Sequence, residues 1–414
     1  MIMAVSKALR FFLVFLQLLM IVALPILLVA PANFSPYFSD PVFNASSINA
    51  MSYLLALRSL QKLEVHPQKR PTLYIFPIIL TVYSFFLAIL IVGHLPYSTK
   101  ILLIGILMTL VFLAFFYSLD MRARQLRLFC VPSGEVNSLK NSRIVKFKPL
   151  KKPILPKTPF NGVVVDFRDE TLSSDWEKFL TDCALKKIQI YNLLQLKETL
   201  TGQVNVKHLA ENTFGDLAPS EQVMISKRVI DLLFLVFIAP VAIPFMILIA
   251  VWVMLDSEGG PFYIQERMGL GGKHFKLIKF RSMSVAYEGS LFTESGEMHR
   301  ITKVGKIIRK YRIDELPQFW NVLKGDMSLI GPRPESVKLA EWYQNEVPFF
   351  MYRHVVRPGI SGWAQVMHGY AAGVDEMKDK LAYDFYYIKH FSLWLDLLIW
   401  YKTIRTVLTG FGSR

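Results

Sequence analysis

Two adjacent carboxylates, Asp314 and Glu315, lie in the stretch best suited to chemistry, residues 309–335. Pro317 follows them, and proline is tolerated in the first turn of a helix. We therefore expect the pair at a helix N-terminus, where the macrodipole favours anions and phosphate. Arginines stand on either side of the pair, including one in a Gly-Pro-Arg-Pro turn. A carboxylate that can attack or hold a cation, beside arginines that can fork onto phosphate oxygens, is what phosphoryl transfer requires.

An Asp-Glu pair at a helix start also has a purely structural interpretation, as a cap and a complement to the dipole. The surrounding sequence favours the chemical one. The strings DELPQFWNVLKGDMSLIGPRPE, KFRSM (279–283) and RPGISGWAQV (357–366) together resemble the bacterial sugar transferase family. Members of that family are polyprenyl-phosphate hexose-1-phosphate transferases. The resemblance is colinear from about Lys227 to the C-terminus and covers roughly the last half of the chain.

The resemblance implies a mechanism. Asp314 would attack the phosphate nearest the sugar of a UDP-sugar, expelling UMP and forming an aspartyl phospho-sugar, which undecaprenyl phosphate would then attack. Mg²⁺ held by Glu315 would neutralise the diphosphate. Three arginines match family positions that hold phosphate groups: Arg309, Arg333 and Arg357. The product would start a lipid-linked glycan, such as an exopolysaccharide, a capsule or an O-antigen.

A Gly-rich turn at residues 269–272 and a strand precede this stretch. The alternation in FKLIKF (275–280) predicts the strand. Such turns usually have no role in binding. Here the turn lies beside Lys279 and Arg281, in a string that the family shares, so we expect these two residues to contact phosphate or nucleotide.

Composition indicates a membrane protein. Of the 414 residues, 53% are hydrophobic, and the mean hydropathy is +0.35. The formal charge of +15 could suggest nucleic acid, but no zinc-finger spacing or RNP-like string is present, and the basic residues cluster beside apolar runs. Attraction to anionic lipid headgroups explains them better. The two cysteines, Cys130 and Cys183, are expected to be free thiols in a reducing compartment.

The N-terminal region, residues 1–119, is predicted to be a transmembrane helical bundle in the bacterial inner membrane. Three uncharged stretches, 11–30, 73–92 and 101–119, are each long enough to cross. Basic residues precede the first and follow the third, so both ends belong in the cytoplasm, which requires an even number of crossings. Residues 43–57 would supply the fourth, although this stretch is short for a hydrocarbon core of ~30 Å.

Residues 120–220 are predicted to form a small cytoplasmic α/β module. Four short apolar runs, LRLFCV, RIVKF, GVVVDF and KIQIYN, are accompanied by helical pieces at 175–185 and 193–200, a pattern typical of a doubly wound fold. The place where a dinucleotide motif would put its glycines reads VPSGEV, so we assign no cofactor. A structural or regulatory role is favoured over ligand binding.

Residues 221–414 are the predicted catalytic domain, of the α+β class, monotopic and facing the cytoplasm. Its first apolar run, 229–255, is long enough to cross a membrane. However, Pro240 and Pro244 should break the helix, and basic residues flank both ends, which places both ends in the cytoplasm. The family's re-entrant membrane element implies the same. Residues 381–409 mix aromatic and charged residues, which suits either interfacial helices or a packed core.

Two other functional classes remain open. A non-catalytic membrane scaffold of a polysaccharide assembly complex should have lost the acidic pair, which is intact here. A multi-span phosphotransferase that works by direct attack would carry its carboxylates in loops between spans. The expected partners are a UDP-sugar, undecaprenyl phosphate and membrane lipids, without nucleic acid; a homodimer is left open. No motif identifies the sugar, because sugar choice depends on a few pocket contacts.

Overall fold

The structure is a computed structural model of the chain. It describes residues 7–29, 40–63, 74–123, 126–139, 141, 145–156, 158–169, 171–204, 218–283, 301–369 and 373–409. The chain divides into two compact units, Met1–Thr201 and Gly202–Arg414, and each has hydrophobic cores of its own. This division falls between Thr201 and Gly202, and the boundary predicted near residue 220 remains a prediction.

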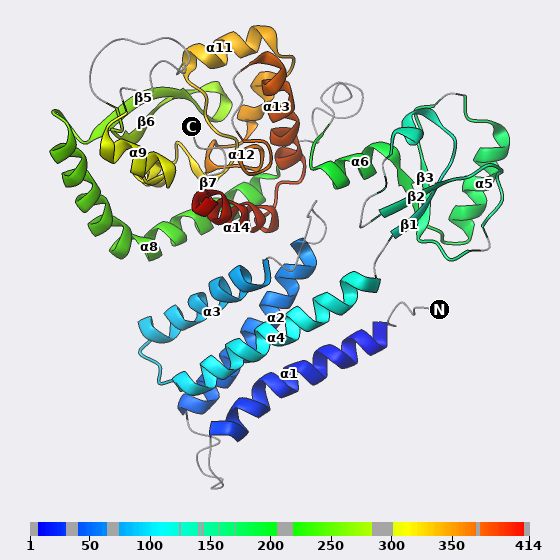
Figure 1. Cartoon of the computed structure of the whole chain (residues 1–414), viewed down its shortest axis with the longest axis horizontal. Helices are drawn as coiled ribbons and strands as arrows, with labels where there is room; N and C mark the ends of the chain where they lie inside the picture. The colour runs from blue at the N-terminus through cyan, green and yellow to red at the C-terminus, as the bar shows by residue number, and fades with distance from the viewer. Residues whose placement is uncertain are drawn as a thin grey trace. The chain divides into compact units, whose positions relative to one another are not determined.

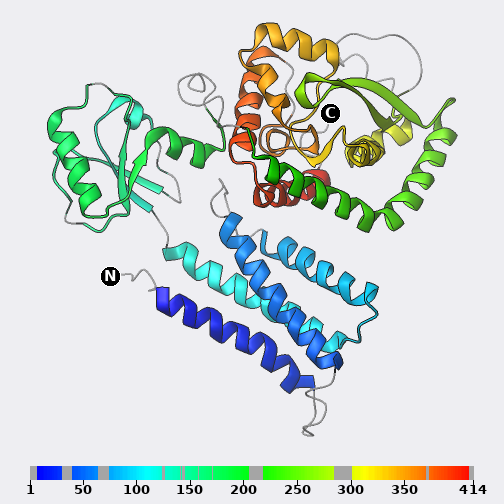
Figure 2. The ribbon, with the colours of Figure 1, turned by 180° about the vertical axis from the view of Figure 1, so that it is seen from behind.

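Four helices open the first unit: α1 (Lys7–Val29), α2 (Asp40–Leu63), α3 (Ile75–Val92) and α4 (Thr99–Ala123). They lie side by side in Figures 1 and 2, with α2 in contact with the other three. By length and composition, Phe12–Val29 and Ile75–Val92 could cross a membrane, and Thr99–Phe115 is a shorter apolar helix. The predicted stretch 43–57 lies within α2, whose 24 residues would reach about 36 Å. That α2 crosses stays a prediction.

Polar side chains explain why the hydropathy of α2 is weak. Asn49 is fully buried and donates to the Ile101 carbonyl of α4 at 3.0 Å. It packs on Gly105 of α4, where any Cβ would come within 2.2 Å of the Asn49 side chain. Small residues allow such close helix approach, and an amide can then bond across the contact. The polar face of α2 is therefore turned into the bundle.

The rest of the first unit is a four-stranded parallel sheet. Its strands are β1 (Leu126–Cys130), β2 (Val145–Pro149), β3 (Gly162–Val165) and β4 (Ile190–Asn192), in the order β2-β1-β3-β4. All four match the predicted apolar runs. One face packs on α5 (Ser174–Leu185) and the other on α6 (Leu193–Thr201), so the predicted helical pieces are also confirmed. Between the strands, α5 is the one α-helical connection in the described residues, so the doubly wound assignment stays a prediction.

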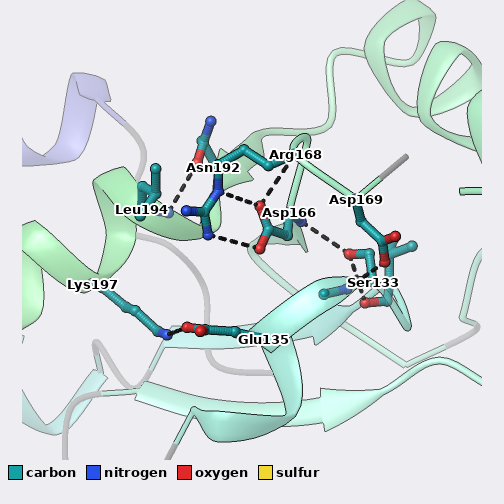
Figure 3. A network of polar contacts seen from close by, with 10 residues as sticks. Ser133, Glu135, Asp166, Arg168, Asp169, Asn192, Leu194 and Lys197 are labelled. Atoms are coloured by element: carbon teal, nitrogen blue, oxygen red, sulfur yellow. Dashed lines mark hydrogen bonds and ion pairs between the residues drawn. The ribbon is translucent and has the colours of Figure 1, made fainter. Parts of the chain in front are cut away.

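The loops at the carboxyl ends of β1 and β3 are tied together by their own side chains (Figure 3). Arg168 contacts both oxygens of Asp166 at 3.0 Å, and the Asp166 N–H donates to Ser133 Oγ at 2.9 Å. Gly134, with a φ of +43°, donates its N–H to the Asp169 carboxylate at 2.5 Å. Ligands of open α/β sheets bind at the carboxyl ends of the strands. In this module, the loop N–H groups of Gly134 and Arg168 at that edge already donate to the chain's own carboxylates.

The second unit is an α+β domain, as predicted. Its strands are β5 (Phe262–Met268) and β6 (His274–Phe280), an antiparallel hairpin, and the parallel pair β7 (Ser328–Ile330) and β8 (Gly359–Ser361). The strand predicted from FKLIKF is β6, and the Gly-rich turn is η5 (Leu270–Gly272). The α-helices are α8 (Glu221–Asp256), α9 (Lys303–Lys310), α10 (Gln318–Lys324), α11 (Val337–Glu346), α12 (Trp363–Met367), α13 (Val374–Lys389) and α14 (Leu393–Thr409).

Helix α8 runs unbroken through Pro240 and Pro244, so the predicted interruption is wrong. The ribbon instead bends along its length (Figures 1 and 2), which is how a helix accommodates lost hydrogen bonds without ending. Both halves of the helix pack toward the same strand. Leu235 lies in a core with Phe275 and Leu277 of β6, whereas Ile249 and Val253 lie in a core with Phe280 of the same strand.

The helices near the C-terminus are mostly packed core. Phe385, Tyr386 and Tyr387 of α13 and Leu398 and Ile399 of α14 are all buried. Of the two alternatives for residues 381–409, the core helix therefore describes these side chains. Two of the charged residues that interrupt the pattern form ion pairs inside the domain: Asp384 with Arg353 and Asp396 with Lys227.

Candidate active site

The acidic pair lies in a single 3₁₀ turn, η7 (Ile313–Glu315), between α9 and α10. Arg312 precedes the turn in the left-handed conformation, with a φ of 54°, which reverses the chain after α9. Pro317 then stands at the N-cap of α10, so the pair is at a helix start as predicted. In a 3₁₀ turn with three residues per turn, adjacent side chains point about 120° apart. The two carboxylates therefore face different surroundings.

Glu315 is buried in an ion pair. Its Oε1 atom accepts from Arg333 Nη2 at 2.8 Å, and Arg312 Nη1 lies 3.8 Å away. Burial alone would raise the pKa of this carboxyl, but Arg333, Lys279 and Arg312 outweigh burial and lower it to about 2. Glu315 is therefore ionised throughout the physiological pH range.

Asp314 is affected in the opposite direction. Burial and the negative charge of Glu315 raise its pKa to about 6, although Lys279, Arg333 and Arg309 oppose the rise. Titratable groups whose surroundings move their pKa values apart are a mark of acid, base and nucleophile assignments in active sites. At pH 7 Asp314 is mostly ionised, yet it is a stronger base than an exposed aspartate.

Cations outnumber the two carboxylates. Burial and the charge of Arg333 lower the pKa of Lys279 on β6 to about 8, while Glu315 raises the pKa of Arg333 above its usual value. With Arg309 and Arg312, four basic side chains influence the acidic pair. The excess positive charge, in a partly buried site, suits a ligand with several negative charges such as a diphosphate.

Two residues predicted to bind phosphate, Arg281 and Arg357, donate hydrogen bonds to the protein backbone. Arg281 is buried and donates Nη2 to the backbone carbonyl of Ser257 at 2.5 Å and to its Oγ at 3.0 Å, so it fastens the end of α8. Arg357 donates Nε to the Gly325 carbonyl at 3.1 Å, near Arg228 of α8. Neither is among the main groups that shift the pKa values of Asp314 and Glu315. Their binding roles stay predictions.

Arg312 was not selected from the sequence. Its guanidinium reaches Glu315 because the left-handed backbone turns the chain back between α9 and η7. The only available signal was its position two residues before Asp314. Backbone conformation decides where such a side chain points, and an arginine with positive φ is rare enough that residue type does not predict it.

The side chains around Glu315 offer few ligands for Mg²⁺. Within the described ranges, no group of three or more His, Cys, Asp or Glu side chains could hold a metal ion. Mg²⁺ commonly takes one or two carboxylates and completes its octahedron with water and substrate phosphates. Glu315 fits such a site through one oxygen, because Arg333 occupies Oε1.

Known proteins resemble the chain, one of them over nearly its whole length. The sequence profile described as "Bacterial sugar transferase" matches residues 222–410. A protein of Aeromonas hydrophila, UDP-N-acetylgalactosamine-undecaprenyl-phosphate N-acetylgalactosaminephosphotransferase, is 44% identical over 402 residues, covering 97% of this chain and 95% of that protein. The chain belongs to the bacterial sugar transferase family. It is therefore an enzyme, as predicted, since the family and its curated relatives are sugar phosphotransferases.

Two further relatives match a smaller share of the chain. A UDP-glucose:undecaprenyl-phosphate glucose-1-phosphate transferase of Klebsiella pneumoniae is 34% identical over 250 residues, 58% of this chain and 53% of that protein. One of the same name from Caulobacter vibrioides is 37% identical over 198 residues, 47% of this chain and 74% of that protein. The resemblance noted from the sequence motifs is confirmed.

Proposed function

We propose that this enzyme transfers a sugar-1-phosphate from a UDP-sugar to undecaprenyl phosphate, releasing UMP and starting a lipid-linked glycan. The names of the relatives support both substrates. The observation that carries the proposal is the acidic pair itself. Its two adjacent carboxylates have opposite pKa shifts and lie among four cations suited to a diphosphate.

In the proposed first step, an ionised Asp314 oxygen attacks the phosphorus that bears the sugar. The P–O bond to UMP breaks, UMP leaves with that oxygen, and an aspartyl phospho-sugar forms. In the second step, an oxygen of undecaprenyl phosphate attacks the same phosphorus, and Asp314 leaves as a carboxylate. Arg333 and Lys279 would neutralise phosphate oxygens in both steps, which is how phosphoryl transfer is mainly accelerated.

We propose Mg²⁺ as the cofactor, with Glu315 as its protein ligand and substrate phosphate oxygens completing the shell. When bound, the ion would neutralise charge on the diphosphate. Glu315 suits this role because it stays ionised, and its pairing with Arg333 fixes the orientation of its carboxylate.

We further propose that α8 enters and leaves the cytoplasmic leaflet of the inner membrane on one side, so that the active site faces the cytoplasm. Its two halves pack against one strand, β6, whose seven residues extend only about 23 Å. Helix α8 bends along its length rather than running straight (Figures 1 and 2). Its outward side chains are apolar; Val241 is 73% and Leu255 81% exposed. A bent helix with such a surface suits a re-entrant anchor.

The decisive experiment measures products with purified protein, undecaprenyl phosphate and Mg²⁺. UDP-N-acetylgalactosamine is the first donor to try, because the relative that covers nearly the whole chain is named for it. Wild type should release UMP and form lipid diphosphate-sugar, and mass spectrometry of quenched enzyme should find a sugar-phosphate adduct on Asp314. Asp314→Asn should abolish transfer and also the exchange of labelled UMP into UDP-sugar without lipid.

The alternatives give different results. Persistent UMP exchange by Asp314→Asn would replace the covalent mechanism with direct attack by the lipid phosphate. No transfer by wild type with any UDP-sugar would favour the scaffold role.

A further inference from the structure

Hydrogen bonds to its backbone carbonyl groups hold the turn that carries Arg333 in place. The carbonyl groups of residues 332–335 each accept a hydrogen bond, from β8, from the 3₁₀ segment η8 (Phe350–Val355) and from β5. The donors are Gly359 to Pro332 (2.9 Å), Arg353 to Arg333 (2.9 Å), Arg267 to Pro334 (3.0 Å) and Met268 to Glu335 (3.1 Å). The prolines fix two φ angles, so these contacts leave the turn little freedom.

Arg353 differs from the other donors because it is a fully buried charge. Its Nε and Nη2 atoms contact Asp384 Oδ2 at 3.0 and 2.7 Å, and Nη1 lies 3.4 Å from Glu335 Oε1. Lys380 Nζ also contacts that Glu335 oxygen, at 2.6 Å. Two carboxylates therefore fix the plane of the guanidinium, and Nη2, which also contacts Asp384, donates to the Arg333 carbonyl at 2.9 Å.

We infer that Arg353 is a positioning residue for the reaction: it fixes the backbone of Arg333, so that the Arg333 guanidinium meets Glu315. The inference rests on the proposed function, in which Arg333 neutralises phosphate. A short covalent path, from the Arg333 carbonyl to its own side chain, joins the buried network to the active site.

A purely stabilising role accounts for less of the geometry. Buried ion pairs add little net stability compared with apolar residues of similar volume. A lysine could neutralise one carboxylate here, but it could not contact two carboxylates and a carbonyl in one plane. The planar guanidinium of Arg353 is needed because it donates to three acceptors: Asp384, Glu335 and the Arg333 carbonyl.

The test is a double-mutant cycle on kcat for UMP release, with Arg353→Lys, Arg333→Ala and the double variant. A side chain misplaced by about 1 Å can cost a factor of about 100, so Arg353→Lys should lower kcat by about 10- to 100-fold. In the Arg333→Ala background, the same change should lower kcat by less than about threefold. An equal loss in both backgrounds would overturn the inference.

A second readout does not require activity. Phenylglyoxal modifies accessible arginines, and peptide mass spectrometry can follow Arg333 alone. If Arg353→Lys frees Arg333 from Glu315, its modification should accelerate by about threefold or more, as local opening exposes it. An unchanged rate would contradict the inference. Because this arm is independent of turnover, it separates failure of the inference from failure of the proposed function, which would appear as no transfer by wild type.

Two other variants test whether misfolding, rather than displacement of Arg333, explains a loss of kcat in Arg353→Lys. Asp384→Asn keeps the Arg353 charge but weakens the contact that orients it, and it should show the same dependence on Arg333 with a smaller loss. Lys378→Ala, in an exposed pair on α13 two residues from Lys380, should change neither readout. If Lys378→Ala and Arg353→Lys reduced kcat equally, the effect would not come from the turn.

Discussion

The pH dependence of turnover follows from the charge of Glu315. The pKa of Asp314 rises from 3.8 to about 6, a shift of about two pH units or 3 kcal/mol, in which burial is the largest cause and Glu315 the second. Three cations oppose the rise, so burial and Glu315 together raise the pKa by more than this net shift, and Glu315 contributes no more than burial does. Replacing it by Gln removes the negative charge, and it also releases Arg333, which itself lowers the Asp314 pKa.

We expect the acid limb of the kcat profile near pH 6 in wild type and about one pH unit lower in Glu315→Gln, the order of shift that a neighbouring charge produces. The sign follows from the nucleophile, because only ionised Asp314 attacks and a lower pKa keeps it ionised in more acidic solution. The assay measures initial UMP release at saturating substrates between about pH 4.5 and pH 8, with each rate normalised to its own maximum.

The matched control is Asp326→Asn, which removes another carboxylate of the same domain. Asp326 is not among the main groups that shift the Asp314 pKa, so its acid limb should stay at the wild-type position. A limb that stays unchanged in Glu315→Gln, or that moves to higher pH, would refute the electrostatic reasoning. It would mean that the group titrating near pH 6 is not Asp314 beside an ionised Glu315.

Two further predictions concern the membrane parts. Gly105→Leu should destabilise the helical bundle by about 1–3 kcal/mol, because its side chain would overlap Asn49, and Asn49→Ala should restore part of the loss; thermal denaturation in detergent measures both. Single cysteines at positions 226 and 257, in a background without Cys130 and Cys183, should both resist an impermeant thiol reagent in intact cells. Labelling at one position alone would mean that α8 crosses, and replacing Pro240 and Pro244 with Leu should favour that outcome.

The sequence predicted those elements whose signal is local. The strands of the α/β module are short apolar runs, and β6 alternates, so periodicity located them. Helix α2 shows the limit of this reasoning. Its Asn49 counts as polar on a hydropathy scale, but in the fold its amide N–H donates to the Ile101 carbonyl of α4, a contact that the scale does not include. The prolines of α8 likewise predicted an interruption where the packed helix only bends.

The site residues show the same difference between local sequence signals and tertiary packing. Asp314, Glu315, Arg309 and Arg333 were identified by type and spacing, and the fold brings them together with Lys279. Arg281 and Arg357 stand in equally suggestive strings, yet their guanidinium groups fasten the backbone. A long side chain can reach in many directions, so its partner depends on tertiary packing that no local pattern contains.

The contact between Lys227 and Asp396 has a consequence for synthesis of the protein. The two residues are 169 positions apart, and at 5–20 residues per second the ribosome takes roughly ten to thirty seconds to make the chain between them. During that time Lys227, at the start of α8, has no Asp396 to pair with. A free ammonium strongly prefers water and headgroups to hydrocarbon, so it opposes passage of this end of the helix through the bilayer. The delayed arrival of its partner would thus keep α8 on one side until the domain closes over it.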